Sequence, residues 1–103
     1  MADLTQKEWT NQLAKDAEAV VIDVRTEAEV AEGHIPNMIH LDIYNPEGFM
    51  DAVNQMDTSK NYFVYCRSGA RSAQACAVLN SLGFEKAFNL MGGFMEWQGE
   101  KVL

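Results

Sequence analysis

Short apolar runs alternate along the chain with longer stretches that begin at helix-capping residues. The apolar runs are rich in β-branched and aromatic residues and predict strands at residues 19–24, 38–41, 61–65 and 86–90. The stretches before, between and after them predict helices at residues 6–15, 27–32, 46–55, 73–82 and 94–98. Strands that alternate with helices predict an α/β domain, in which a mostly parallel sheet carries helices on both faces. Ligands of such sheets bind beyond the carboxyl ends of the strands.

Two of the predicted helices share one start signal. Thr5 is followed by Glu8, and Thr26 is followed by Glu29, so each pair forms a capping box that satisfies free N–H groups at the helix start. Gly83 stands where a C-cap belongs, just after the helix predicted at 73–82. These signals set the predicted boundaries.

Length and charge narrow the range of functions. The 103 residues suit one domain spanning 1–103, and an apolar fraction of 48% argues against a disordered chain. The net charge of −7, with only eight Lys and Arg, argues against nucleic acid and against a membrane surface as partners. Two of the three arginines, Arg67 and Arg71, nevertheless lie within six residues of Cys66.

The cysteines indicate a reducing compartment. Cys66 and Cys76 are too few for a disulfide scaffold, and neither belongs to a Cys/His cluster with zinc spacing. The first residues lack a positive segment followed by an apolar run, and no stretch approaches the roughly 20 apolar residues of a membrane span. We therefore expect a cytoplasmic protein without a metal. Cys76 lies in a predicted helix, where we expect core packing, although a disulfide with oxidised Cys66 is an alternative.

The segment from Cys66 to Arg71 carries the strongest chemical signal. It joins a predicted strand to a predicted helix, so its backbone N–H groups can curl around the sulfur as an anion-binding nest. The positive end of the helix and the charges of Arg67 and Arg71 favour a thiolate. Gly69 permits a backbone conformation that a Cβ would obstruct. We predict that the pKa of Cys66 lies below the ordinary value of about 8.5.

Two other interpretations of this loop stay open. Free cysteines are often buried and inert, which would make Cys66 an ordinary core residue. Cysteine-dependent phosphatases and arsenate reductases use a similar loop, but their pattern places five residues between Cys and Arg. Here only four residues lie between Cys66 and Arg71. A smaller ring suits one sulfur atom better than a tetrahedral phosphoryl group.

Three segments together resemble the rhodanese family. The first is Val21-Ile22-Asp23-Val24-Arg25, followed by Glu29 and Gly33-His34-Ile35-Pro36. The second is the six-residue loop 66–71, and the third combines residues 82–84 with 89–94 and Trp97. The likeness spans about residues 20–97 in the family's order. It departs where Asn37-Met38 stands in place of the frequent Gly-Ala, which puts a local turn in doubt.

The resemblance implies a three-layer α/β/α domain with a central, mostly parallel sheet of about five strands. It implies a sulfurtransferase without a cofactor, in which Cys66 takes sulfane sulfur from thiosulfate or a persulfide and carries it as a persulfide. The donor and the persulfide would be held by the loop residues Arg67, Ser68, Gly69, Ala70 and Arg71.

The same resemblance implies a small anionic sulfur donor. Members that use thiosulfate or protein persulfides resemble this chain at Arg67, whereas mercaptopyruvate-specific members usually carry a small neutral residue there. The acceptor would be cyanide in vitro, and a thiol, a thioredoxin-like protein or a sulfur-trafficking protein in cells. We expect a monomer or weak homodimer. A non-catalytic interaction module on the same fold is the alternative.

Other polar residues have two interpretations each. Arg25 follows the first predicted strand, where it can attract an anionic donor or pair with Asp23 or Glu29. His34 and His40 invite a role as base, but Gly-His-Ile-Pro is typical of a turn, so we expect a structural role for His34. His40 has no supporting motif. Five acidic residues are expected on solvated faces: Asp16, Glu18, Glu27, Glu29 and Glu32.

Overall fold

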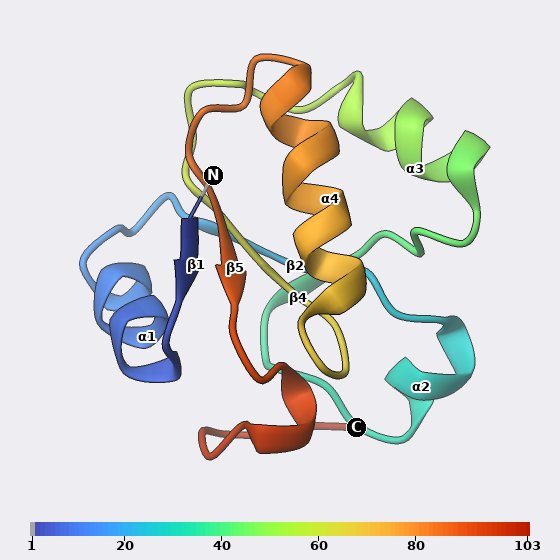
Figure 1. Ribbon diagram of the computed structural model, residues 1–103. Helices are drawn as coiled ribbons and strands as arrows, with labels where there is room; N and C mark the ends of the chain where they lie inside the picture. The colour runs from blue at the N-terminus through green and yellow to red at the C-terminus, as the bar shows by residue number, and fades with distance from the viewer. Residues whose placement is uncertain (1) are drawn as a thin grey trace.

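The computed structural model describes residues 2–103, in which a five-stranded sheet has helices packed on both faces (Figure 1). All neighbouring strands run parallel, in the order β1-β5-β4-β2-β3. The elements are β1 (Ala2–Leu4), α1 (Gln6–Ala14), β2 (Val20–Asp23), α2 (Glu27–Ala31), β3 (Met38–His40), α3 (Pro46–Val53), β4 (Tyr62–Tyr65), α4 (Ala70–Ser81), β5 (Ala87–Leu90) and the 3-10 turn η1 (Phe94–Glu96). The predicted α/β class and parallel five-stranded sheet are confirmed.

The central strand β4 connects two hydrophobic cores. Tyr62 and Val64 face the core under α3 and α4, whereas Phe63 and Tyr65 face the core under α1. Trp9 of α1 is fully buried in that second core, with its ring centroid 5.7 Å from that of Phe63 in a T-shaped arrangement. Because β4 is buried on both faces, its apolar run is continuous rather than alternating. Cys66, which follows β4, is therefore anchored by a strand that packs in both cores.

Strand β1 is not predicted by the sequence. It has three residues, with the polar Asp3 at its centre, and it pairs with β5 so that Asp3 lies opposite Asn89. So short a segment has no periodic pattern of its own, and only its hydrogen bonds to β5 define it as a strand.

Both capping boxes are confirmed, but the start of α4 is not where the sequence predicts it. The helix begins at Ala70 rather than at residue 73, so Arg71 and Ser72 lie in its first turn. Its N-cap is Gly69, with φ of 105° and no side-chain cap bond. A glycine N-cap is a weaker start signal than a Ser, Thr, Asp or Asn that caps with its side chain, which explains the wrong boundary.

Parallel strands bring their carboxyl ends to one edge of the sheet. The loop after β4, helix α2 and the turn before η1 gather at this edge, toward the bottom of the view (Figure 1). Within residues 2–103, no helix is both long and apolar enough to cross a membrane. The loop after β4 contains Cys66.

Candidate active site

Cys66 follows β4 directly and is fully buried. Its carbonyl accepts a hydrogen bond of 2.8 Å from the N–H of Phe94, and the Arg67 carbonyl accepts one of 3.0 Å from Met95. Gly93 makes this contact possible. Its φ is 60°, and a Cβ there would overlap the backbone of Arg67 and Ser68. The turn after β5 therefore fixes the backbone of the cysteine loop.

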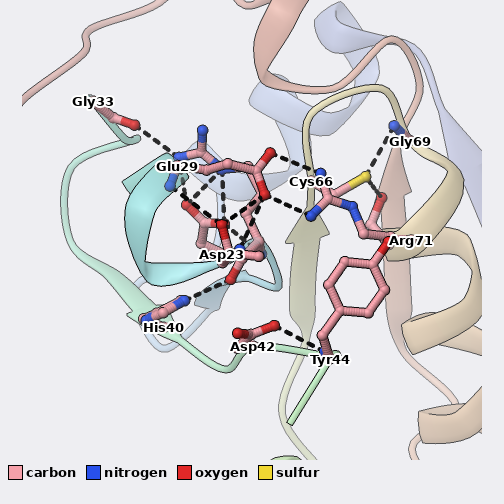
Figure 2. A network of polar contacts seen from close by, with 12 residues as sticks. Asp23, Glu29, Gly33, His40, Asp42, Tyr44, Cys66, Gly69 and Arg71 are labelled. Carbon is pink, nitrogen blue, oxygen red and sulfur yellow. Dashed lines mark hydrogen bonds and ion pairs between the residues drawn. The ribbon is translucent and has the colours of Figure 1, made fainter. Parts of the chain in front are cut away.

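The sulfur of Cys66 lies at the start of α4 (Figure 2). The Gly69 N–H donates to Sγ over 3.1 Å, and the Ser72 hydroxyl oxygen lies 3.4 Å from Sγ. Burial raises the pKa of this thiol, but the Ser72 side chain and the backbone N–H groups of residues 68, 69 and 72 outweigh it. The net pKa is lowered, as the nest predicts.

The guanidinium of Arg71 forms an ion pair with the carboxylate of Glu29. Its guanidinium donates two hydrogen bonds to Glu29, of 2.7 and 2.8 Å, and lies 5.5 Å from the ring centre of Tyr44 (Figure 2). Hydrogen bonds from Arg71 lower the pKa of Glu29 to about 2, and those same bonds raise the pKa of Arg71. The expectation that Glu29 lies on a solvated face is wrong. Its spacing from Thr26 indicates a cap, and only the fold places it opposite Arg71.

The other loop residues are open to solvent. Arg67, Ser68 and Ala70 are exposed, and Arg67 forms no ion pair within the part of the chain that the structure describes. Arg67 lines a depression of about 300 Å³ together with Arg25, Glu29, Glu32, Gly33, Phe94 and Met95. The depression therefore offers one unpaired cation next to the cysteine loop.

Arg25 is buried beside this depression. It donates to both carboxylate oxygens of Asp23 and, over 2.7 Å, to the Gly33 carbonyl. Burial lowers the pKa of Arg25, but the hydrogen bonds and charge of Asp23 outweigh it, so the net pKa is raised. The pairing with Asp23 is the stabilising role that the sequence left open. Contact with an anionic donor stays a prediction.

The two histidines contact backbone groups. His34 exchanges backbone hydrogen bonds with Val102, and its Nδ1 lies 3.0 Å from the Ile35 carbonyl. His40 Nε2 lies 2.6 Å from the Arg25 carbonyl and donates to it (Figure 2). These contacts agree with a structural role for His34. Among residues 2–103, no group of three His, Cys, Asp or Glu side chains is arranged to hold a metal ion.

Cys76 is buried inside α4, packed in the same core as Leu79. Burial raises the pKa of its thiol to about 12. Core packing is confirmed for Cys76, and both cysteines are free thiols. The redox pairing with Cys66 stays a prediction.

Two residues beside the cysteine loop, Ser72 and Asn89, are not among the site residues that the sequence predicts. Both are buried, and the Ser72 hydroxyl lies 2.5 Å from Asn89 Oδ1. The available signal was the polar Asn89 inside an otherwise apolar strand, because a buried amide needs partners. Its partners come from β1 and α4, which the sequence does not place beside it.

Comparison with known proteins shows which family this chain resembles. The family model described as "Rhodanese-like domain" matches residues 6–100. A protein of Allochromatium vinosum named "Sulfurtransferase" is 33% identical over 95 residues, covering 92% of this chain and 86% of that one. "Thiosulfate sulfurtransferase GlpE" of Pseudomonas syringae pv. syringae is 32% identical, covering 84% and 79%. The crystal structure of a rhodanese-like domain protein from Staphylococcus aureus superposes with a TM-score of 0.82 at 31% identity, covering 97% and 94%.

Proposed function

Because this chain belongs to the rhodanese-like sulfurtransferase family, we propose that it transfers sulfane sulfur from an anionic donor through a persulfide on Cys66. The observation that carries the proposal is the environment of Sγ, which accepts the Gly69 N–H over 3.1 Å and lies 3.4 Å from the Ser72 hydroxyl. Such donors stabilise a thiolate, which is the nucleophilic form of cysteine.

In the first half of the cycle, the Cys66 thiolate attacks the outer sulfur of thiosulfate. A new S–S bond forms to Cys66, the S–S bond within thiosulfate breaks, and sulfite leaves with its electron pair. Exposed Arg67 provides the charge that attracts the dianion, because its guanidinium has no carboxylate partner within residues 2–103. A relative named thiosulfate sulfurtransferase supports this choice of donor. A persulfide donor would use the same attack.

In the second half, a thiophilic acceptor attacks the outer sulfur of the persulfide. The S–S bond breaks, Cys66 regains its thiolate, and the acceptor leaves as thiocyanate or as a new persulfide. The outer sulfur carries the negative charge before this step. Backbone N–H groups at the start of α4 suit that anion.

The size of the loop supports sulfur rather than phosphate as cargo. Helix α4 already begins at Ala70, so only residues 67–69 form irregular backbone between Cys66 and the helix. A phosphoryl group needs N–H donors around three oxygens, whereas a persulfide adds one atom to Sγ. The loop therefore supports sulfur transfer better than a cysteine-dependent phosphatase activity.

We assign the cycle to a reducing compartment, with a thiol or a thiol-bearing protein as acceptor. Cys66 must begin as a free thiol, and cytosolic redox conditions keep it so. The exposed side chains of Met91 and Met95 lie next to the turn that holds the cysteine loop. They provide apolar surface for such an acceptor.

The test is the intact mass of the protein after incubation with thiosulfate. We expect a gain of one sulfur atom in the wild type, its loss on treatment with cyanide, and no gain in Cys66→Ser. Cys76→Ala is the matched control and should gain the sulfur normally. If thiosulfate adds no sulfur, a persulfide-loaded protein donor is tried next. Failure with both donors in a folded protein would contradict the proposal.

A further inference from the structure

The Ser72 hydroxyl lies between two acceptors. Its oxygen is 3.4 Å from Cys66 Sγ and 2.5 Å from Asn89 Oδ1. Ser72 is fully buried and Asn89 is 3% exposed, so bulk water does not mediate between them. A serine hydroxyl has one hydrogen to donate.

The orientation of the Asn89 amide follows from its other partners. Its Nδ2 donates to Asp3 Oδ1 over 2.8 Å and to the Gly69 carbonyl over 3.2 Å. Both partners are acceptors, so the nitrogen must face them and the oxygen must face Ser72. The hydrogen between Ser72 and Asn89 therefore belongs to the serine.

This arrangement suits one protonation state of Cys66. When Ser72 donates to Asn89, it presents a lone pair to the sulfur, which the S–H of a neutral thiol can meet. A thiolate has no hydrogen, so it would face that lone pair directly. The Ser72 hydroxyl stabilises the thiolate only when it turns away from Asn89.

We infer that Asn89, held by Asp3 and the Gly69 carbonyl, is a positioning residue that competes with the Cys66 sulfur for the single hydrogen of Ser72. The competition itself concerns Cys66 alone. Its use in sulfur transfer rests on the proposed function. This competition links strand β1, through Asp3, to the Cys66 sulfur.

The competition has a different outcome at each stage of the cycle. In the thiolate, the hydroxyl turns to Sγ and leaves Asn89 Oδ1 without a donor. In the persulfide, the charge moves to the outer sulfur, and the hydroxyl returns to Asn89. Ser72 keeps its proton throughout, so each change is a rotation of one O–H bond. Asn89 thereby favours the sulfur-loaded state over the bare thiolate.

Other charges around the sulfur stay in place during this rotation. The charge of Cys66 helps to raise the pKa of Arg71, and Arg71 stays paired with Glu29. Asp3 is the carboxylate beyond Asn89. Removing Asp3 also removes a negative charge, so its effect through Ser72 must be separated from its direct effect.

The experiment measures the rate at which iodoacetamide alkylates Cys66 as a function of pH, with the site identified by peptide mass. Asn89→Leu and Asp3→Ala are compared in the wild-type and the Ser72→Ala backgrounds. We expect Ser72→Ala to raise the midpoint by about 0.5 to 1 pH unit, the effect of one hydrogen bond. Asn89→Leu should lower it by a similar amount, and Asp3→Ala by less.

The decisive comparison is the Ser72→Ala background, in which neither variant should move the midpoint through the hydroxyl. Equal shifts in both backgrounds would overturn the inference, because Asn89 would then act through general polarity. An unchanged midpoint in folded Asn89→Leu would overturn it too. Should Asn89→Leu fail to fold, Asp3→Ala decides alone, since Asp3 is exposed. Glu85→Ala, at another exposed carboxylate, should leave the midpoint unchanged.

Alkylation reads Cys66 whether or not the protein transfers sulfur. A shifted midpoint without sulfur uptake from any donor would contradict the proposed function and leave the inference standing. Sulfur uptake with unshifted midpoints would contradict the inference and leave the proposed function standing.

Discussion

Glu29 holds the guanidinium of Arg71 in two hydrogen bonds of 2.7 and 2.8 Å, although the two residues are 42 positions apart in the chain. The same carboxylate caps α2 through the N–H and hydroxyl of Thr26. One side chain therefore joins the start of α2 to the first turn of α4. The charge of Cys66 contributes to the raised pKa of Arg71, so this pair connects helix capping to the electrostatics of the site.

Glu29→Gln should lower sulfur transfer. The amide oxygen can still cap α2, but it cannot form the charged pair with both nitrogens of Arg71. We expect kcat/KM with thiosulfate to fall about tenfold, which corresponds to about 1.4 kcal/mol of lost orientation. The matched control is Glu8→Gln, which alters the equivalent capping box of α1. Equal activities of the two variants would contradict the assignment.

The Glu29–Arg71 pair should stabilise the fold only above a low pH. The folded pKa of Glu29 is about 2, against an ordinary value of 4.5. A depressed pKa contributes stability that is complete above about pH 4.5 and is lost as the pH falls toward 2. The free energy of unfolding of the wild type should therefore exceed that of Glu29→Gln by about 1 kcal/mol at pH 6. This difference should shrink as the pH falls from about 4.5 to about 2. Urea unfolding across this range measures it, and a constant difference would contradict the pairing.

The two cysteines should react very differently. Hydrogen bonds lower the pKa of Cys66, whereas burial raises that of Cys76 to about 12. Iodoacetamide at pH 7 should modify Cys66 and leave Cys76 intact, with a midpoint for Cys66 below about 8.5. Peptide mass mapping at a series of pH values measures the modification of each cysteine separately. Similar rates at the two thiols would show that the site does not activate Cys66.

Gly93→Ala should displace the cysteine loop. A Cβ at Gly93 would overlap the Arg67 backbone, whereas a Cβ at Gly83 would meet no atom within 4 Å. Both glycines have positive φ, so either substitution should cost about 1 kcal/mol or more of backbone strain. Gly83→Ala therefore measures strain alone. We expect both variants to unfold at lower urea, but only Gly93→Ala to lose most sulfur transfer.

Comparable activity in these two glycine variants would show that the contact between Gly93 and the loop is not needed. Thermal unfolding of both proteins is the companion measurement, since a loss of activity through unfolding would appear in Gly83→Ala as well.

Local patterns predicted most of the fold because the forces that form these elements act over a few residues. The capping boxes at Thr5 and Thr26 are confirmed, and so are the apolar strands. The sequence does not predict strand β1, because a three-residue strand is defined by its partner β5. The predicted start of α4 lies too late in the chain, because Gly69 caps this helix without a side chain.

The amino-acid sequence by itself determined the α/β class, the buried strand before Cys66 and the nest that lowers the pKa of that thiol, because neighbours along the chain create each of them. Only the tertiary structure decided which groups control that nest. Glu29 meets Arg71 and Asn89 meets Ser72 because parallel strands bring distant segments to one edge of the sheet. A hydrogen bond depends on distances of about 3 Å, and sequence spacing does not specify such distances between separate elements.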